Sequence, residues 1–211
     1  KNEPFQQFLA QTSQWLLKYQ PQNVEEALAL KVDGEETLEQ KLHGMISKIG
    51  ENMKLRRFEI VKKSDQEAFG AYIHMGGTIS VLAVLENTTD AELAKDVAMH
   101  IAALNPRYIS REDVPQEVVN KEREILRQQA LNEGKPEHIV EKMVEGRLGK
   151  FYQEVCLLEQ EFVKNPDLTV AKLLKQAGDV KVKLFFRYQL GEGIEKKETN
   201  FAEEVMSQVK K

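Results

Sequence analysis

Two short apolar runs on either side of a glycine pair constrain the fold more than any other part of the sequence. Alternating apolar residues mark the first run at Phe69, Ala71 and Ile73, and the second at Ile79, Val81, Ala83 and Leu85. Gly76 and Gly77 lie between the runs, and glycine readily adopts the positive φ angles that a tight hairpin turn requires. The pattern predicts an antiparallel strand pair in which the two runs face each other. A lone hairpin is only marginally stable in water, so a third strand and covering helices are expected.

Period-two alternation predicts two further strands. One has a single apolar face made of Val180, Val182, Leu184, Phe186, Tyr188 and Leu190. The other is expected over residues 55–63, where Phe58 and Ile60 point to the same side. Apolar residues at helical spacing predict helices over residues 4–19, from Thr37 to Gly50 and from Thr89 to Leu104, with a short helix after Thr169.

Residues 115–158 differ from the rest, because two long helical patterns follow one another with little apolar content of their own. Asn132 to Pro136 separates them, with Gly134 just past the first helix and proline at the start of the second, as is typical of a connection between helices. The second pattern carries a seam of Val140, Val144, Leu148, Phe151 and Val155 at spacings of four and three. We predict an antiparallel coiled-coil hairpin that turns at Gly134-Lys135 and projects from the body.

Composition excludes several classes of protein. Of the 211 residues, 41% are hydrophobic and 30% charged, as in ordinary globular proteins, and the net charge of −4 argues against nucleic acid as the main partner. Cys156 is the single cysteine, which rules out an intrachain disulfide and favours a reducing compartment. No apolar run approaches the roughly 20 residues of a membrane span. We therefore expect a cytoplasmic protein that binds neither nucleic acid nor membrane.

A search for reaction chemistry finds no candidate catalytic residue, metal ligand or cofactor site. The histidines are too far apart in the sequence for familiar zinc motifs: His43, His74, His100 and His138. Cys156 lies among apolar residues and is predicted to be a buried hydrophobe rather than a nucleophile. His100 is expected to be a hydrogen-bonded packing residue. His74 ends a predicted strand and faces away from Ile73, so we expect it to be exposed at a sheet end.

Several stretches together resemble one family, elongation factor Ts of bacterial type, the guanine nucleotide exchange factor for the GTPase elongation factor Tu. They occur in family order: LRRFE, AYIHMGG, AMHIAALNP, LNEGKPEHIVEKMVEGRLGKF and RYQLGEGIEKKETNFAEEV. The resemblance implies a protein without bond chemistry or cofactor, which binds elongation factor Tu and promotes GDP release during protein biosynthesis. It also implies partner-binding roles for His74, Met75, Gly76, Val163, Phe201 and Val205.

The fold class implied is α+β, with small antiparallel three-stranded sheets packed against helices and an inserted antiparallel coiled-coil helical hairpin. The expected division is an N-terminal core subdomain of residues 1–63, a C-terminal core subdomain of residues 64–114 and 159–193, the helical hairpin of residues 115–158, and a C-terminal helical module of residues 194–211. In the family a Thr-Asp-Phe motif, which disturbs the magnesium and phosphate site of the GTPase, directly precedes the position of Lys1. We expect an N-terminally truncated chain with weakened exchange activity.

Two other classes stay open. A scaffold or self-associating module, such as a homodimer, would use the helical hairpin as its main surface and would leave GDP release unchanged. A hydrolase or transferase would need a pocket in which polar groups converge.

Overall fold

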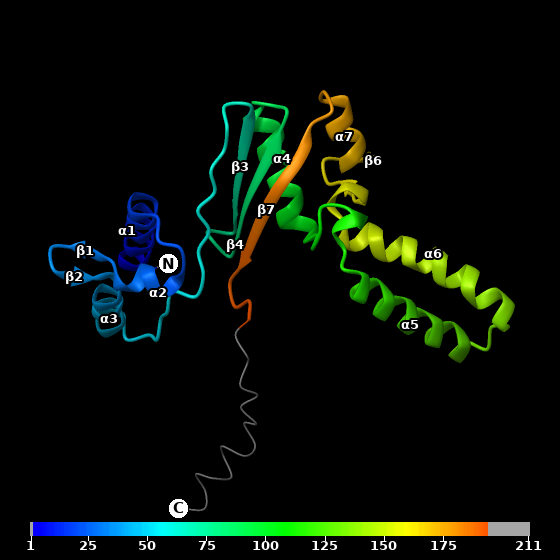
Figure 1. Ribbon diagram of the computed structural model, residues 1–211, viewed down its shortest axis with the longest axis horizontal. Coiled ribbons are helices and arrows are strands. Elements are labelled where there is room, and N and C mark those ends of the chain that lie inside the picture. Colours follow the sequence, from blue (N-terminus) through cyan, green and yellow to red (C-terminus); the bar gives the residue numbers. More distant parts are fainter. Residues whose placement is uncertain (1, 194–211) are drawn as a thin grey trace, which may run out of the picture. The chain divides into compact units, whose positions relative to one another are not determined.

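The structure, a computed structural model, describes residues 2–193 (Figure 1). These residues belong to two compact units, of which the first ends at Lys62 and the second starts at Lys63. Helices combine with small antiparallel sheets in both units, which confirms the α+β class. Within the described range, no helix has the length and apolar character needed to cross a membrane.

The first unit is a group of three helices with a short β-ribbon. Helix α1 (Glu3–Tyr19) begins at Asn2, whose side chain accepts the Phe5 N–H, and α2 (Val24–Ala29) begins at Asn23. Strands β1 (Lys31–Asp33) and β2 (Glu36–Thr37) form the ribbon, which leads into α3 (Leu38–Ile49). A capping box starts α3, and the left-handed Gly50 follows its last residue.

The prediction of a strand over residues 55–63 is wrong. The structure assigns neither helix nor strand to this segment, although Phe58 and Ile60 are half-buried as the alternation indicates. A strand is defined by its hydrogen-bond ladder with a neighbouring strand, and none of the described strands pairs with these residues. Alternation alone therefore indicated which side chains are half-buried and not a paired strand.

The second unit is built on a three-stranded antiparallel sheet in the order β3-β4-β7. Strands β3 (Glu67–His74) and β4 (Ile79–Glu86) form the predicted hairpin, and β7 (Lys181–Gln189) is the predicted third strand. The two apolar runs pair as predicted, but their apolar sets lie on opposite faces of the sheet, because Phe69 lies opposite Val84 and Ile73 lies opposite Ser80. Directly opposite residues of two strands lie on the same face of a sheet. The four-residue loop of residues 75–78 sets a register in which odd-numbered residues of β3 lie opposite even-numbered residues of β4.

A bulge in β7 corrects a second prediction. Leu184 lies opposite Val84, but Val182 already lies opposite Leu85, so the register shifts by one residue between them. Val182 and Phe185 consequently pack on the core, whereas the strict alternation placed Leu184 and Phe186 beside Val182. An extra residue in one strand moves each later side chain of that strand to the opposite face of the sheet.

Helix α4 (Ala91–Leu104) covers one face of this sheet and completes its core (Figure 1). Asp90 caps the helix, one residue later than the predicted Thr89. Gly70 allows the close approach of β3, because a Cβ built on it would lie 1.9 Å from the Ala94 carbonyl oxygen. The buried core contains small and branched apolar residues from both layers: Ala68, Val81, Ala83, Leu85, Ala94, Val97, Ala98 and Ile101.

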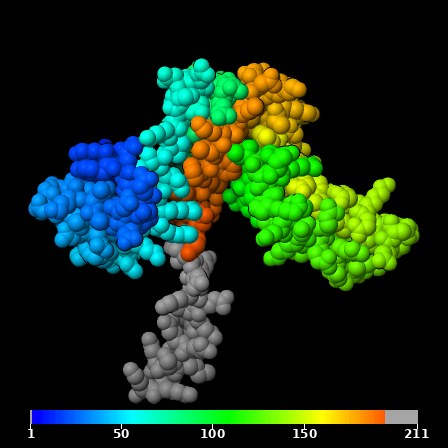
Figure 2. Space-filling view, viewed as in Figure 1, coloured from blue at the N-terminus to red at the C-terminus, as the bar shows by residue number. Residues whose placement is uncertain are grey.

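The long helices α5 (Gln116–Asn132) and α6 (Glu137–Val155) form the predicted helical hairpin, with Gly134 in a left-handed conformation at the turn. The pair runs away from the sheet in Figure 1 and forms a lobe of its own, green to yellow-green, in Figure 2. Val140, Val144 and Leu148 are buried in the seam as predicted. Ion pairs join the two helices, among them Arg147 with Glu133 at 2.8 Å and Arg127 with Glu141 at 3.3 Å.

Two glycines inside α6 weaken this hairpin. A Cβ built on Gly146 or Gly149 would meet no atom within 4 Å, so neither glycine is needed for packing. Replacing Gly146 by alanine should raise the free energy of unfolding by about 0.5–1 kcal/mol, because alanine loses less backbone entropy in a helix. Chemical denaturation followed by circular dichroism measures this, and a lower stability would show that Gly146 has a packing role.

The chain returns from the hairpin to the sheet through short elements. Two 3₁₀ turns, η1 (Arg111–Asp113) and η2 (Leu157–Glu159), flank the base of the helical hairpin. A two-stranded ribbon of β5 (Glu161–Phe162) and β6 (Asn165–Thr169) follows, and Thr169 caps the short helix α7 (Val170–Gln176) as predicted. Leu157, Phe162, Val170 and Leu174 belong to the same buried core as the apolar residues of α4.

Candidate partner-binding surface

His74 is exposed at the end of β3, as the sequence predicts. Its Nδ1 lies 3.3 Å from the Tyr72 hydroxyl, and the two rings stack with centroids 6.0 Å apart. Both side chains belong to the face of the sheet on which α4 packs, because they alternate with Ile73. The imidazole is therefore held in place while one edge remains open to solvent.

Met75 and Gly76 form the turn after His74. Both have positive φ angles, 47° and 67°, and the Gly77 N–H donates to the His74 carbonyl at 3.1 Å. Positive φ at both central residues is the type I′ requirement, which is met here by a methionine as well as a glycine. The turn orients the Met75 side chain into solvent, and 76% of its surface is exposed.

Three large apolar side chains are exposed at this end of the sheet. Ile73 is 68% exposed, and Leu190, whose N–H donates to the Thr78 carbonyl at 2.8 Å, is 77% exposed. Together with Met75 they form a surface that we call the hairpin-tip patch: Ile73, Met75 and Leu190. Exposed large apolar residues that gather at one end of a sheet are a candidate interaction site.

A pocket of about 260 Å³ lies beside His74, between the sheet and α4. Arg187 and Gln189 of β7 line it, and the sequence reasoning missed both residues. Strict alternation placed Arg187 on the face away from the core, but the bulge turns it toward α4, where its Nη2 donates to the Ala102 carbonyl at 3.3 Å. The full lining is Tyr72, His74, Ile79, Met99, Ala102, Ala103, Arg187 and Gln189.

Val163 lies in the turn of the β5–β6 ribbon, where its side chain is 41% exposed. Its backbone N–H donates to Nδ1 of His100 at 3.2 Å. Met99, the residue before His100 on α4, lines the pocket that contains His74. Val163 is thus bonded to His100, and the neighbouring residue Met99 lines the same pocket as His74.

His100 confirms the prediction of a hydrogen-bonded packing residue. It is fully buried, stacks on Phe162, and its Nε2 lies 2.9 Å from Gln160 Oε1. The Gln160 amide nitrogen donates to the Glu154 carbonyl at 2.8 Å, which directs Oε1 toward the imidazole. Because Nδ1 accepts from Val163, the proton resides on Nε2 and the ring is neutral. Burial lowers the pKa of His100, although the Gln160 hydrogen bond opposes this shift.

Cys156 is a buried side chain, as predicted. The side chain is fully buried at the base of the helical hairpin, and burial raises the pKa of its thiol to about 11. At neutral pH the thiolate is scarcely populated, so Cys156 is a packing residue and not a nucleophile.

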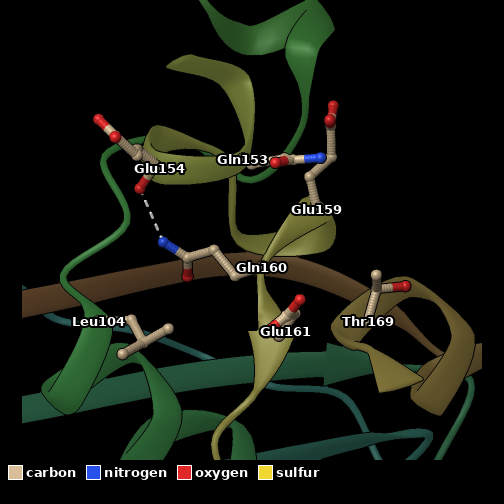
Figure 3. Close-up of a pocket in the computed structure, with 7 residues that line it drawn as sticks. All are labelled: Leu104, Gln153, Glu154, Glu159, Gln160, Glu161 and Thr169. Atoms are coloured by element: carbon tan, nitrogen blue, oxygen red, sulfur yellow. Dashed lines mark hydrogen bonds between the residues drawn. The ribbon is translucent and has the colours of Figure 1, made fainter. Parts of the chain in front are cut away.

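A larger pocket, of about 450 Å³, lies where α4, α6 and the β5–β6 ribbon meet (Figure 3). Its lining contains three glutamates, whose carboxylates are set apart from one another in the figure. Glu159 forms an ion pair with Arg111, and the lining has no histidine, cysteine, serine or lysine that could pair with a carboxylate as nucleophile or base. Across residues 2–193, no group of three or more histidine, cysteine or acidic side chains is arranged to hold a metal ion.

Two of the sequence-predicted partner-binding residues, Phe201 and Val205, lie outside the described residues. The other four, His74, Met75, Gly76 and Val163, all belong to the second unit. In a comparison with protein families, residues 1–192 match the family described as Elongation factor TS.

Proposed function

Because the chain belongs to the elongation factor Ts family, whose role is in translation, we propose that it binds elongation factor Tu and promotes the release of GDP. The proposal places this activity in the cytoplasm, with the GTPase as partner and without a cofactor. The observation that carries it is the family match over residues 1–192 together with the exposed hairpin-tip patch beside His74.

The exchange activity follows from linkage. A protein that binds the nucleotide-free GTPase more tightly than the GDP-bound form must weaken GDP binding by the same factor. Magnesium bridges phosphate oxygens and protein ligands in such GTPases, so displacing the elements that hold it removes several contacts together. No bond is made or broken by the exchange factor in this scheme.

The geometry of the second unit supports a binding role for the hairpin tip. The turn residues Met75 and Gly76 are fixed by a hydrogen bond, and His74 is held by Tyr72, so the surface is largely formed before a partner arrives. A pre-formed surface loses little conformational entropy on binding. Phe201 and Val205 enter the proposal through the family resemblance alone.

Replacing His74 by alanine should weaken the complex with elongation factor Tu by about 1–3 kcal/mol, which is roughly 5- to 150-fold in Kd. The melting temperature should stay nearly unchanged, because the side chain is exposed. Calorimetric titration and a melting curve measure the two quantities. His43→Ala, a change of an exposed histidine on α3, is the matched control. An unchanged Kd, or a fall in melting temperature that matches the loss of binding, would contradict a contact role for His74.

The complex with elongation factor Tu also distinguishes an exchange factor from a scaffold protein. A scaffold that used the helical hairpin would bind the GTPase equally well in its GDP-bound and empty states, and such a partner shifts no equilibrium. Ile125 and Ile139 of that hairpin, 42% and 39% exposed, are the residues such a scaffold would offer. Measuring the GDP off-rate separates the two functions, because only an exchange factor increases it.

The expected dependence on the upstream motif is tested in the same assay. We propose that a version carrying a Thr-Asp-Phe motif ahead of Lys1 accelerates GDP release more than the chain alone, while their affinities differ less. Equal acceleration by both would overturn this division between affinity and exchange.

A further inference from the structure

Arg187 lies in the pocket beside His74 with only part of its hydrogen-bonding capacity used. Its Nη1 donates to Gln189 Oε1 at 2.8 Å, and its Nη2 donates to the Ala102 carbonyl at 3.3 Å. The Nε–H is buried and has no hydrogen-bond partner in the described part of the chain. An unpaired buried donor costs free energy, so a ligand that accepted from this Nε–H would remove a cost that residues 2–193 leave in place.

The charge of Arg187 is likewise only partly balanced. Among residues 2–193, no carboxylate forms an ion pair with its guanidinium. Ala102 belongs to the last turn of α4, where the helix dipole supplies a partial negative charge and not a full counter-charge. The nearby Glu192 accepts the backbone N–H of Gln189 at 3.3 Å and does not line the pocket.

The other polar side chains of the pocket also offer donors. Gln189 uses its Oε1 to accept from Arg187, so its amide NH₂ group can donate to another acceptor. When the Tyr72 hydroxyl donates to Nδ1 of His74, the imidazole retains an N–H at Nε2. Ile79 and Met99 provide apolar wall. The pocket thus complements a group that combines an apolar stem with several strong acceptors.

We propose that this pocket receives an aspartate or glutamate side chain of the partner GTPase, with Arg187 as its main anchor. The inference rests on the proposed function and adds to it the chemistry of one partner residue and a role for Arg187. A carboxylate can accept from the guanidinium and from Gln189 at once, and charge-assisted bonds of this kind are about twice as strong as neutral ones. Ile79 and Met99 of the pocket would supply apolar contact beside this charged centre.

Gln189→Glu tests the proposal without removing Arg187. The new carboxylate would pair with the guanidinium inside the pocket and repel an incoming acid, so Kd for GDP-bound elongation factor Tu should rise at least tenfold while the melting temperature does not fall. Arg187→Met should weaken binding tenfold or more, and Arg187→Lys, which keeps the charge but loses the planar fork, should weaken it less. Lys181→Met, at the exposed start of the same strand, is the control and should bind as wild type does.

The outcomes separate this inference from the function on which it rests. If the wild type binds and both Gln189→Glu and Arg187→Met bind with the same Kd, the proposed role of the pocket is overturned and the proposed function stands. If both variants lower the melting temperature, Met99→Glu brings a carboxylate from α4 instead, and normal binding by that variant would also overturn the role of the pocket. Absence of binding by the wild-type chain would overturn the proposed function itself.

Discussion

Replacement of Gly70 by alanine is expected to lower the free energy of unfolding of the second unit by about 3 kcal/mol, at the upper end of the usual range for overpacking. The added Cβ would lie 1.9 Å from the Ala94 carbonyl oxygen, 2.1 Å from its carbonyl carbon and 2.7 Å from the Lys95 nitrogen. These are backbone atoms of α4, so no side-chain rotation relieves the clash. The helix must move off the sheet and open the core between them.

Thermal denaturation measures the effect, with an expected fall in melting temperature of about 6–12 °C. Gly146→Ala is the matched control, because it adds the same methyl group at a helical position with open space around it and should be stabilising. A Gly70→Ala variant that melts with the wild type would show that α4 and β3 do not pack at this distance.

Replacement of His100 by alanine should lower the free energy of unfolding by about 3–4 kcal/mol. The change removes a fully buried side chain and leaves a cavity beside Phe162, as in other large-to-small core substitutions. It also removes the hydrogen-bond partner of both the Gln160 side chain and the Val163 N–H. A double-mutant cycle with Gln160→Ala should be non-additive, because the two side chains act as one network. Strict additivity would contradict the hydrogen bond between them.

His100 should also make stability depend on pH in a defined direction. Burial holds the pKa of this imidazole below 6.5 in the folded protein, so the unfolded chain takes up the proton first as the pH falls. The contribution of neutral His100 to the free energy of unfolding is complete above pH 6.5. It is lost as the pH falls from there through the folded-state pKa. Urea denaturation between pH 5 and 8 should therefore show a steeper acid loss for the wild type than for His100→Ala. Parallel curves would show that His100 is not buried in the neutral form.

Features determined by neighbouring residues could be predicted from the sequence. The helical hairpin follows from the Val140 to Val155 seam and from Gly134 with Pro136, which all act within one or two turns of helix. The same holds for Thr37, whose capping box with Gln40 begins α3. The hairpin of β3 and β4 was predicted from Gly76 and Gly77 for the same reason.

Features determined by pairing between distant segments could not be predicted. The bulge opposite Leu85 depends on how β7 meets β4, and it alone decides that Arg187 faces α4. The alternation of residues 55–63 is genuine, but a strand also needs a partner. His100 and Gln160 are 60 positions apart in the chain, and nothing local to either residue indicates that they meet. Within the candidate site, the exposed position of His74 could therefore be predicted from the sequence, and the position of Arg187 in the same pocket could not.

The rate at which GDP leaves elongation factor Tu tests the proposed exchange activity most directly. A fluorescent GDP analogue is loaded onto the GTPase, and its release into excess unlabelled GDP is followed by stopped flow at fixed magnesium, with increasing concentrations of this chain. We predict that the off-rate rises and saturates with concentration, and that the concentration needed for half of the maximal effect increases for His74→Ala but not for His43→Ala. Binding by calorimetry with an off-rate that stays at its intrinsic value would contradict this prediction.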